Sequence, residues 1–203
     1  MVVNKVIAVI SFQLLFMAVK IYIDQGHNPT NPNAGAEGNG FREQDLVYRI
    51  GILTAQYLRA AGLDVRLSRP TAETQLGTSN ASSLAARVND ANAWGADYFI
   101  SLHANASEIT SSSGSEAFVY SLGTTAQALA ENILVQLNNS TGLQNRGVSA
   151  RPTLYVLRRT AMPATLVELG FITNPYDAEL MAYSPQLFAM GVANGVLAFL
   201  GML

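Results

Sequence analysis

The sequence predicts a single α/β domain, in which a mostly parallel, twisted sheet of about six strands is covered by helices on both faces. Short apolar segments of strand length alternate with longer segments whose apolar residues recur at helical spacing. A length of 203 residues suits one domain. With 49% hydrophobic and 13% charged residues, the chain can bury a large core.

The elements follow from these patterns in chain order. The helix expected over residues 43–61 carries Leu46, Val47, Ile50, Leu53 and Leu58 on one face. Further helices are expected over residues 82–94, 125–139 and 185–203, the last with Pro185 in its first turn. The segments expected as strands are 20–24, 64–68, 97–103, 116–121, 153–157 and 164–169.

Residues 1–19 are predicted to form a hydrophobic N-terminal segment that precedes the domain at residues 20–203. Lys5 is followed by fourteen residues, 6–19, in which Ser11 and Gln13 are the only polar ones. This length is typical of an export signal and is shorter than the roughly 20 apolar residues of a spanning helix. We expect an uncleaved export or anchoring signal that associates with a membrane through residues 6–19. A packed N-terminal helix is the alternative.

Charge and composition exclude several classes of function. The chain has 12 basic and 14 acidic residues, and this balance argues against nucleic acid as a partner. It has no cysteine and only two histidines, which excludes disulfides, thiolate metal sites and a cysteine nucleophile. Any metal site must therefore be built from His27, His103 and carboxylates.

Both histidines and one carboxylate fall at the ends of predicted strands. His27 follows the first strand, His103 ends the third, and Glu168 lies near the end of the last. Because functional groups gather at the carboxyl ends of parallel strands, these three side chains are expected to converge. Singly, each has an ordinary explanation, such as a structural hydrogen bond or an ion pair. Together, two histidines and one carboxylate are a ligand set for catalytic zinc.

Glu43 supplies a second carboxylate at the predicted start of the first long helix. The default role of an acidic residue there is to complement the helix dipole. With two carboxylates in reach of two histidines, one could bind the metal and the other could act as a base. At this stage the residues leave that assignment open.

Six segments in this order resemble the zinc-dependent N-acetylmuramoyl-L-alanine amidases of bacterial cell walls, in the type 3 branch. The resemblance covers about residues 20–203. The first motif departs from the family's usual Asp-Pro-Gly-His-Gly, because Gln25 and Asn28 stand in place of proline and glycine. The segments are Ile23-Asp-Gln-Gly-His27, Arg42-Glu-Gln, Val65-Arg-Leu-Ser-Arg69, Arg87 to Asn92, Ile100-Ser-Leu-His-Ala-Asn105 and the run from Pro163 to Asn174.

The resemblance implies a Zn²⁺ ion bound by His27, Glu43 and His103, with Glu168 as the catalytic carboxylate. Asp24 and Asn105 stand beside the ligands in the motifs and could orient them. Asp24 could equally accept backbone N–H bonds in the turn that follows it.

The resemblance also implies a peptidoglycan hydrolase. Zinc-activated water would cleave the amide between the lactyl group of N-acetylmuramic acid and the L-alanine of the stem peptide. The expected partner is peptidoglycan, the expected location is the cell envelope or the exterior, and the expected state is a monomer. Two alternatives stay open: a zinc carboxy- or aminopeptidase with the same ligands and base, and an inactive wall- or partner-binding module.

Overall fold

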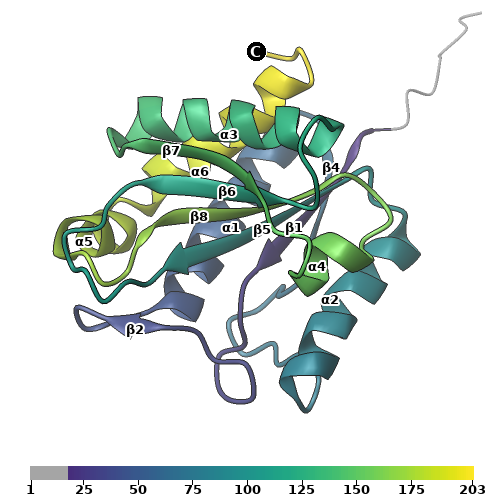
Figure 1. Cartoon of the computed structure of the whole chain (residues 1–203). Helices are drawn as coiled ribbons and strands as arrows, with labels where there is room; N and C mark the ends of the chain where they lie inside the picture. The colour runs from purple at the N-terminus through teal and green to yellow at the C-terminus, as the bar shows by residue number, and fades with distance from the viewer. Residues whose placement is uncertain (1–17) are drawn as a thin grey trace, which may run out of the picture.

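The computed structural model describes residues 18–203 (Figure 1). The predictions for the N-terminal segment, as an export signal or as a packed helix, fall almost entirely on residues outside this range. Among the described residues, no helix combines the length and the apolar character that a membrane crossing requires.

Six strands form the main sheet in the order β4-β1-β5-β8-β6-β7. All neighbours are parallel except β6 and β8, which are antiparallel. A separate two-stranded hairpin pairs β2 (Glu37–Gly38) with β3 (Phe41–Arg42). The strands of the main sheet are β1 (Lys20–Gln25), β4 (Asp64–Leu67), β5 (Tyr98–Asn105), β6 (Ser115–Val119), β7 (Asn145–Ala150) and β8 (Ala164–Phe171).

Helices cover both faces of the sheet. Ile21 and Ile23 of β1 belong to the core under α1 (Glu43–Ala60), α3 (Thr125–Thr141) and α6 (Pro185–Phe199). Tyr22, which points to the opposite face, belongs to a smaller core with α2 (Asn80–Trp94) and α4 (Tyr155–Arg159). Helix α5 (Pro175–Tyr183) follows β8 at the sheet edge (Figure 1). The predicted α/β class, with a mostly parallel sheet between two layers of helices, is confirmed.

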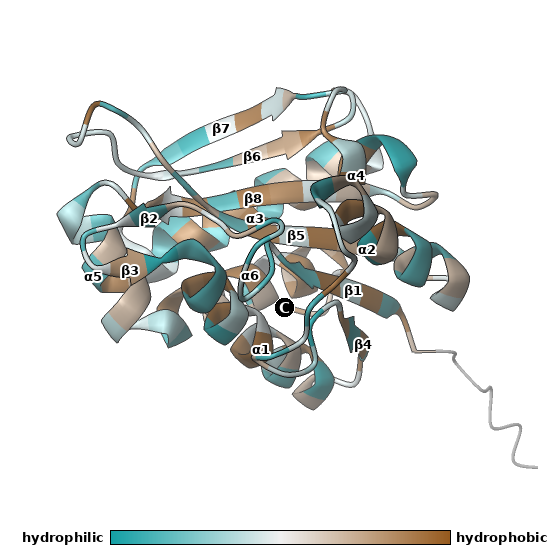
Figure 2. Cartoon of the chain, turned by 90° about the horizontal axis from the view of Figure 1, so that it is seen from below, coloured by the Kyte–Doolittle hydropathy of each residue, from teal (hydrophilic) through white to brown (hydrophobic). Residues whose placement is uncertain are grey.

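The predicted strand at 153–157 is wrong, because the chain forms α4 there. An apolar run this short fits a buried strand or one turn of helix equally well, and only Val156 and Leu157 are buried. The sixth strand is instead β7, an edge strand of exposed polar residues that gave no apolar signal; its colour in Figure 2 is more hydrophilic than that of β8. Sequence reasoning also missed α5, although the Asn174 side chain caps it and Pro175 opens it.

Candidate metal centre

The fold brings the four chemically capable side chains to one edge of the sheet. His27 follows β1, His103 lies in β5, and Glu168 in β8 is paired in register with His103. Glu43 is the first residue of α1. Because β1, β5 and β8 are parallel neighbours, their carboxyl ends meet at this edge, as the sequence predicted.

His27, Glu43 and His103 offer one ligand atom each, and these atoms all lie within 4.8 Å of one another. Glu43 Oε1 is 3.1 Å from His27 Nε2 and 3.0 Å from His103 Nδ1. The two imidazole rings meet edge to face, with centroids 4.8 Å apart. Two imidazole nitrogens and a carboxylate oxygen in this arrangement suit a zinc ion that keeps one position open.

Glu43 is held rigidly by its surroundings. Its Oε1 accepts a hydrogen bond from the Ala104 N–H and its Oε2 accepts one from the Ala36 N–H. Burial alone would raise the pKa of Glu43, but hydrogen bonds with His103 and His27 outweigh burial and hold this pKa well below its usual range. Glu43 is therefore an anion at neutral pH, as a metal ligand must be.

Two glycines leave the space that these ligands occupy. A Cβ at Gly26 would stand 2.6 Å from His103 Cε1, and a Cβ at Gly35 would stand 2.8 Å from Glu43 Oε2. Any larger residue at either position would displace a candidate ligand. Beside the histidines lies a cavity of about 140 Å³, walled by Leu154 and Tyr155 at the start of α4.

Glu168 is a carboxylate with an unsatisfied oxygen. Its Oε2 is buried and has no hydrogen-bond partner. Burial, followed by repulsion from Glu43 and Glu116, raises the pKa of Glu168 to about 8. Glu116 faces Glu168 across the β6–β8 pair, and its Oε1 accepts a 2.6 Å hydrogen bond from Asn105 Nδ2. Asn105 thus contacts the neighbour of Glu168, and makes no hydrogen bond to His27 or His103.

Asp24 lies in a second buried polar cluster, next to the candidate ligands. Its Oδ1 accepts a hydrogen bond from Arg87 Nη1 at 2.6 Å, and its Oδ2 accepts one from Ser101 Oγ at 2.7 Å. Burial alone would raise the pKa of Asp24. The charge and hydrogen bond of the Arg87 guanidinium outweigh burial, so the pKa of Asp24 is lowered. Neither of these two bonds joins Asp24 to a histidine or to the turn that follows it.

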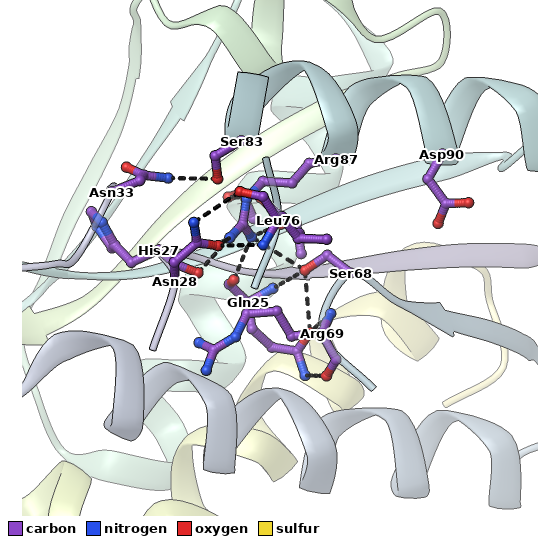
Figure 3. Close-up of polar contacts among 12 residues, drawn as sticks. Gln25, His27, Asn28, Asn33, Ser68, Arg69, Leu76, Ser83, Arg87 and Asp90 are labelled. Carbon is purple, nitrogen blue, oxygen red and sulfur yellow. Dashed lines mark hydrogen bonds and ion pairs between the residues drawn. The ribbon is translucent and has the colours of Figure 1, made fainter. Parts of the chain in front are cut away.

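Arg87 connects this cluster to the candidate metal ligands. Its Nη2 donates a hydrogen bond to the His27 carbonyl (Figure 3). His27 has a φ of 64°, a left-handed conformation that costs a non-glycine residue on the order of 1–3 kcal/mol. The bond from Arg87 offsets part of this cost. The sequence carried no signal that Arg87 holds His27.

The two departures from the family's first motif also have structural roles. Gln25 is fully buried, and its amide exchanges hydrogen bonds with the backbone of Arg69. The Asn28 amide donates to the carbonyls of Pro32 and Leu76 and accepts from the Leu76 N–H (Figure 3). Both side chains thus attach the His27 loop to the segment that follows β4.

A family profile described as N-acetylmuramoyl-L-alanine amidase matches residues 21–198. The chain belongs to this amidase family. It is 36% identical over 183 residues to the N-acetylmuramoyl-L-alanine amidase CwlM of Bacillus licheniformis. This alignment covers 88% of this chain and 67% of that amidase. It is 37% identical over 186 residues to the sporulation-specific N-acetylmuramoyl-L-alanine amidase of Bacillus subtilis, and that alignment also covers 88% of this chain and 67% of the relative.

Solved amidase structures share the fold. The catalytic domain of the amidase CwlV from Bacillus (Paenibacillus) polymyxa var. colistinus superposes with a TM-score of 0.79 at 27% identity. The superposition covers 91% of this chain and 99% of that domain. The family resemblance that the sequence motifs predicted is therefore confirmed.

Proposed function

We propose that this chain is a zinc-dependent peptidoglycan amidase. It hydrolyses the amide that joins the lactyl group of N-acetylmuramic acid to the L-alanine of the stem peptide. The observation that carries the proposal is the convergence of His27, Glu43 and His103 beside Glu168, in a chain of the amidase family. The alternative of an inactive binding module is disfavoured because all four side chains are present and close together.

The three ligands share one role in this proposal, and neighbouring groups hold them in place. His27, Glu43 and His103 hold the ion and leave one position for reactants. When bound, Zn²⁺ supplies Lewis-acid chemistry that activates water and polarises the scissile carbonyl. Ala104 and Ala36 keep the Glu43 carboxylate in its orientation through their N–H groups, and Arg87 holds the backbone of His27.

Glu168 moves the proton. No hydrogen bond of the described chain occupies its Oε2, so this oxygen is not committed to a structural contact. Glu168 accepts the proton from that water and then delivers it to the nitrogen of the leaving L-alanine. Burial raises the pKa of Glu168 above that of an ordinary carboxyl group, which makes Glu168 a better base for the first step.

The location and the assembly state follow from the substrate. Peptidoglycan lies in the cell envelope, so the proposed enzyme acts there or outside the cell. Both histidines, Glu43 and Glu168 come from one chain, so a monomer is sufficient for the reaction. Membrane association through residues 6–19 stays a prediction.

Digestion of purified peptidoglycan with the zinc-loaded protein tests the proposal, with mass spectrometry of the products. We expect new L-alanine amino termini and peptide-free glycan strands. Shortened stem peptides that remain attached to sugar would contradict the amidase and favour a peptidase.

Two variants separate the roles of the base and the ligands. Glu168→Ala is expected to fold and retain zinc while losing turnover by roughly 10²–10⁴-fold. His103→Ala is expected to lose the metal itself, which elemental analysis of the purified protein measures. Near-normal turnover of Glu168→Ala would show that another residue is the base.

A further inference from the structure

A strip of the sheet, formed by β6 and β8, leads away from Glu168 on the face that also carries α2 and α4. Phe118 and Leu166 both belong to the core on that face, and Glu116 and Glu168 lie two positions along the same strands. On β7, Ser149 is paired with Phe118 and is exposed. Helix α4 packs on the same face and contributes Val156 and Leu157 to the core that holds Phe118 and Leu166.

Arg151 stands at the end of this strip. Its backbone N–H donates to the Val119 carbonyl, which places it directly after β7. Its guanidinium lies over the Phe118 ring, 5.0 Å from the centroid. This stacking orders the cation against the face that bears Glu168. Because Phe118 is two positions along β6 from Glu116, the stacking point is roughly 7 Å along the strand from the level of Glu168.

The charge of Arg151 is available to a ligand. The side chain is exposed, and none of the ion pairs among residues 18–203 includes it. Its surroundings contrast with this positive charge, because Glu43, Glu116 and Glu168 place three carboxyl groups near the reaction centre. An anionic group of a bound ligand can pair with the Arg151 guanidinium.

We propose that Arg151 binds a backbone or side-chain carboxylate on the peptide arm of the substrate, about two residues beyond the scissile amide. Two extended residues span about 7 Å, which matches the distance along β6. The peptide arm lies over Glu116 and Ser149, and Arg151 makes the protein select acidic arms over amidated ones. This inference rests on the proposed amidase function, which supplies the position of the scissile bond.

Binding measurements test this selectivity independently of turnover. The zinc-loaded Glu168→Gln protein is titrated calorimetrically with two muropeptides. One has a free carboxylate on the residue after L-alanine, and the other has a carboxamide there. We expect the carboxylate form to bind roughly tenfold more tightly. Adding Arg151→Gln is expected to bring the ratio close to one, and Arg151→Lys is expected to keep most of it.

Arg66→Gln in the same background is the matched control. Arg66 also lies 5.0 Å over an aromatic ring, that of Trp94, but it belongs to β4 at the far edge of the sheet and pairs with Asp90. This variant is expected to keep the full preference for the carboxylate form.

Three outcomes would overturn the inference: equal affinity for the two muropeptides, an unchanged ratio in Arg151→Gln, or no binding of either form. Turnover of both forms by the wild-type enzyme is measured in parallel. Absence of cleavage together with selective binding would contradict the amidase proposal alone. Cleavage without any selectivity would contradict the role of Arg151 alone.

Discussion

Two groups of buried polar side chains lie next to each other at the carboxyl ends of β1, β5 and β8, and they differ in whether their carboxylate oxygens are hydrogen bonded. Around Asp24, both carboxylate oxygens have partners, and the pKa of Asp24 is lowered. Around Glu168, one buried oxygen has no partner, and the pKa is raised to about 8. The Asp24 carboxylate is fixed by Arg87 and Ser101, whereas the Glu168 carboxyl has an oxygen without a structural partner, as is common for groups that take part in chemistry.

Removing Arg87, the cation beside Asp24, is expected to have the largest effect on stability. Arg87→Ala leaves Asp24 as a buried charge without its ion-pair partner, so we expect a loss of about 3–5 kcal/mol in the free energy of unfolding. Urea unfolding of the metal-free protein measures it. Arg66→Ala breaks an exposed Arg–Asp pair and is expected to cost about 1 kcal/mol or less. Equal losses in the two variants would contradict the expectation that the buried Asp24 charge depends on Arg87.

Replacing Glu168 is expected to increase the free energy of unfolding, and the size of the increase is expected to depend on pH. The pKa of Glu168 in the folded protein, about 8, exceeds its ordinary value of 4.5, so ionising Glu168 costs folding free energy. This cost is absent below pH 4.5, grows as the pH rises to about 8, and is constant above.

Glu168→Gln removes that cost in the metal-free protein. The difference in free energy of unfolding between the variant and the wild type is expected to grow, in favour of the variant, by roughly 2 kcal/mol as the pH rises from about 4.5 to about 9. This is less than half of the ~5 kcal/mol that the full shift would give without solvent screening. Urea unfolding at the two pH values measures the gain, with the exposed Glu131→Gln as control. A gain that does not change with pH would show that Glu168 is not held in an unfavourable site.

A methyl group at Gly35 is expected to disturb the candidate ligands more than the scaffold. Its nearest neighbours would be Glu43 Cβ and Oε2 at 2.8 Å and His27 Cδ2 at 3.0 Å. We expect Gly35→Ala to weaken zinc binding roughly tenfold, about 1.4 kcal/mol, with a smaller change in the stability of the metal-free protein. Competition with a chromophoric chelator measures the affinity. An unchanged affinity would argue that Glu43 and His27 do not bind the ion together.

The smallest effect on stability is expected from the loss of the hydrogen bond between Asn105 and Glu116, the carboxylate that faces Glu168. Asn105→Ala removes the hydrogen bond to Glu116, so we expect a loss of about 1 kcal/mol in stability. Zinc affinity is expected to stay the same, because Asn105 has no hydrogen bond to His27 or His103. If the same chelator assay showed a loss of zinc, Asn105 would orient a ligand after all.

The α/β class and the position of the candidate site were predictable from the sequence because both depend on local patterns. The strands that lead to His27, His103 and Glu168 are mostly apolar and buried on both faces, as expected of the central strands of a parallel sheet. Their polar ends then identify the edge of the sheet where they meet. Glu43 could be assigned a metal only through the family resemblance, because an acidic residue in the first turn of a helix is common without one.

The tertiary structure decided what depends on contacts between distant segments. Arg87 reaches Asp24 and the carbonyl of His27, and no local pattern encodes such a pairing. The edge strand β7 exists because β6 offers it a partner, while its own residues are polar. The same partner places Arg151 over Phe118 on the face of Glu168. Local apolar periodicity therefore determined the layers of this protein, whereas long-range pairing decided which of its polar groups are held in place and which are free to react.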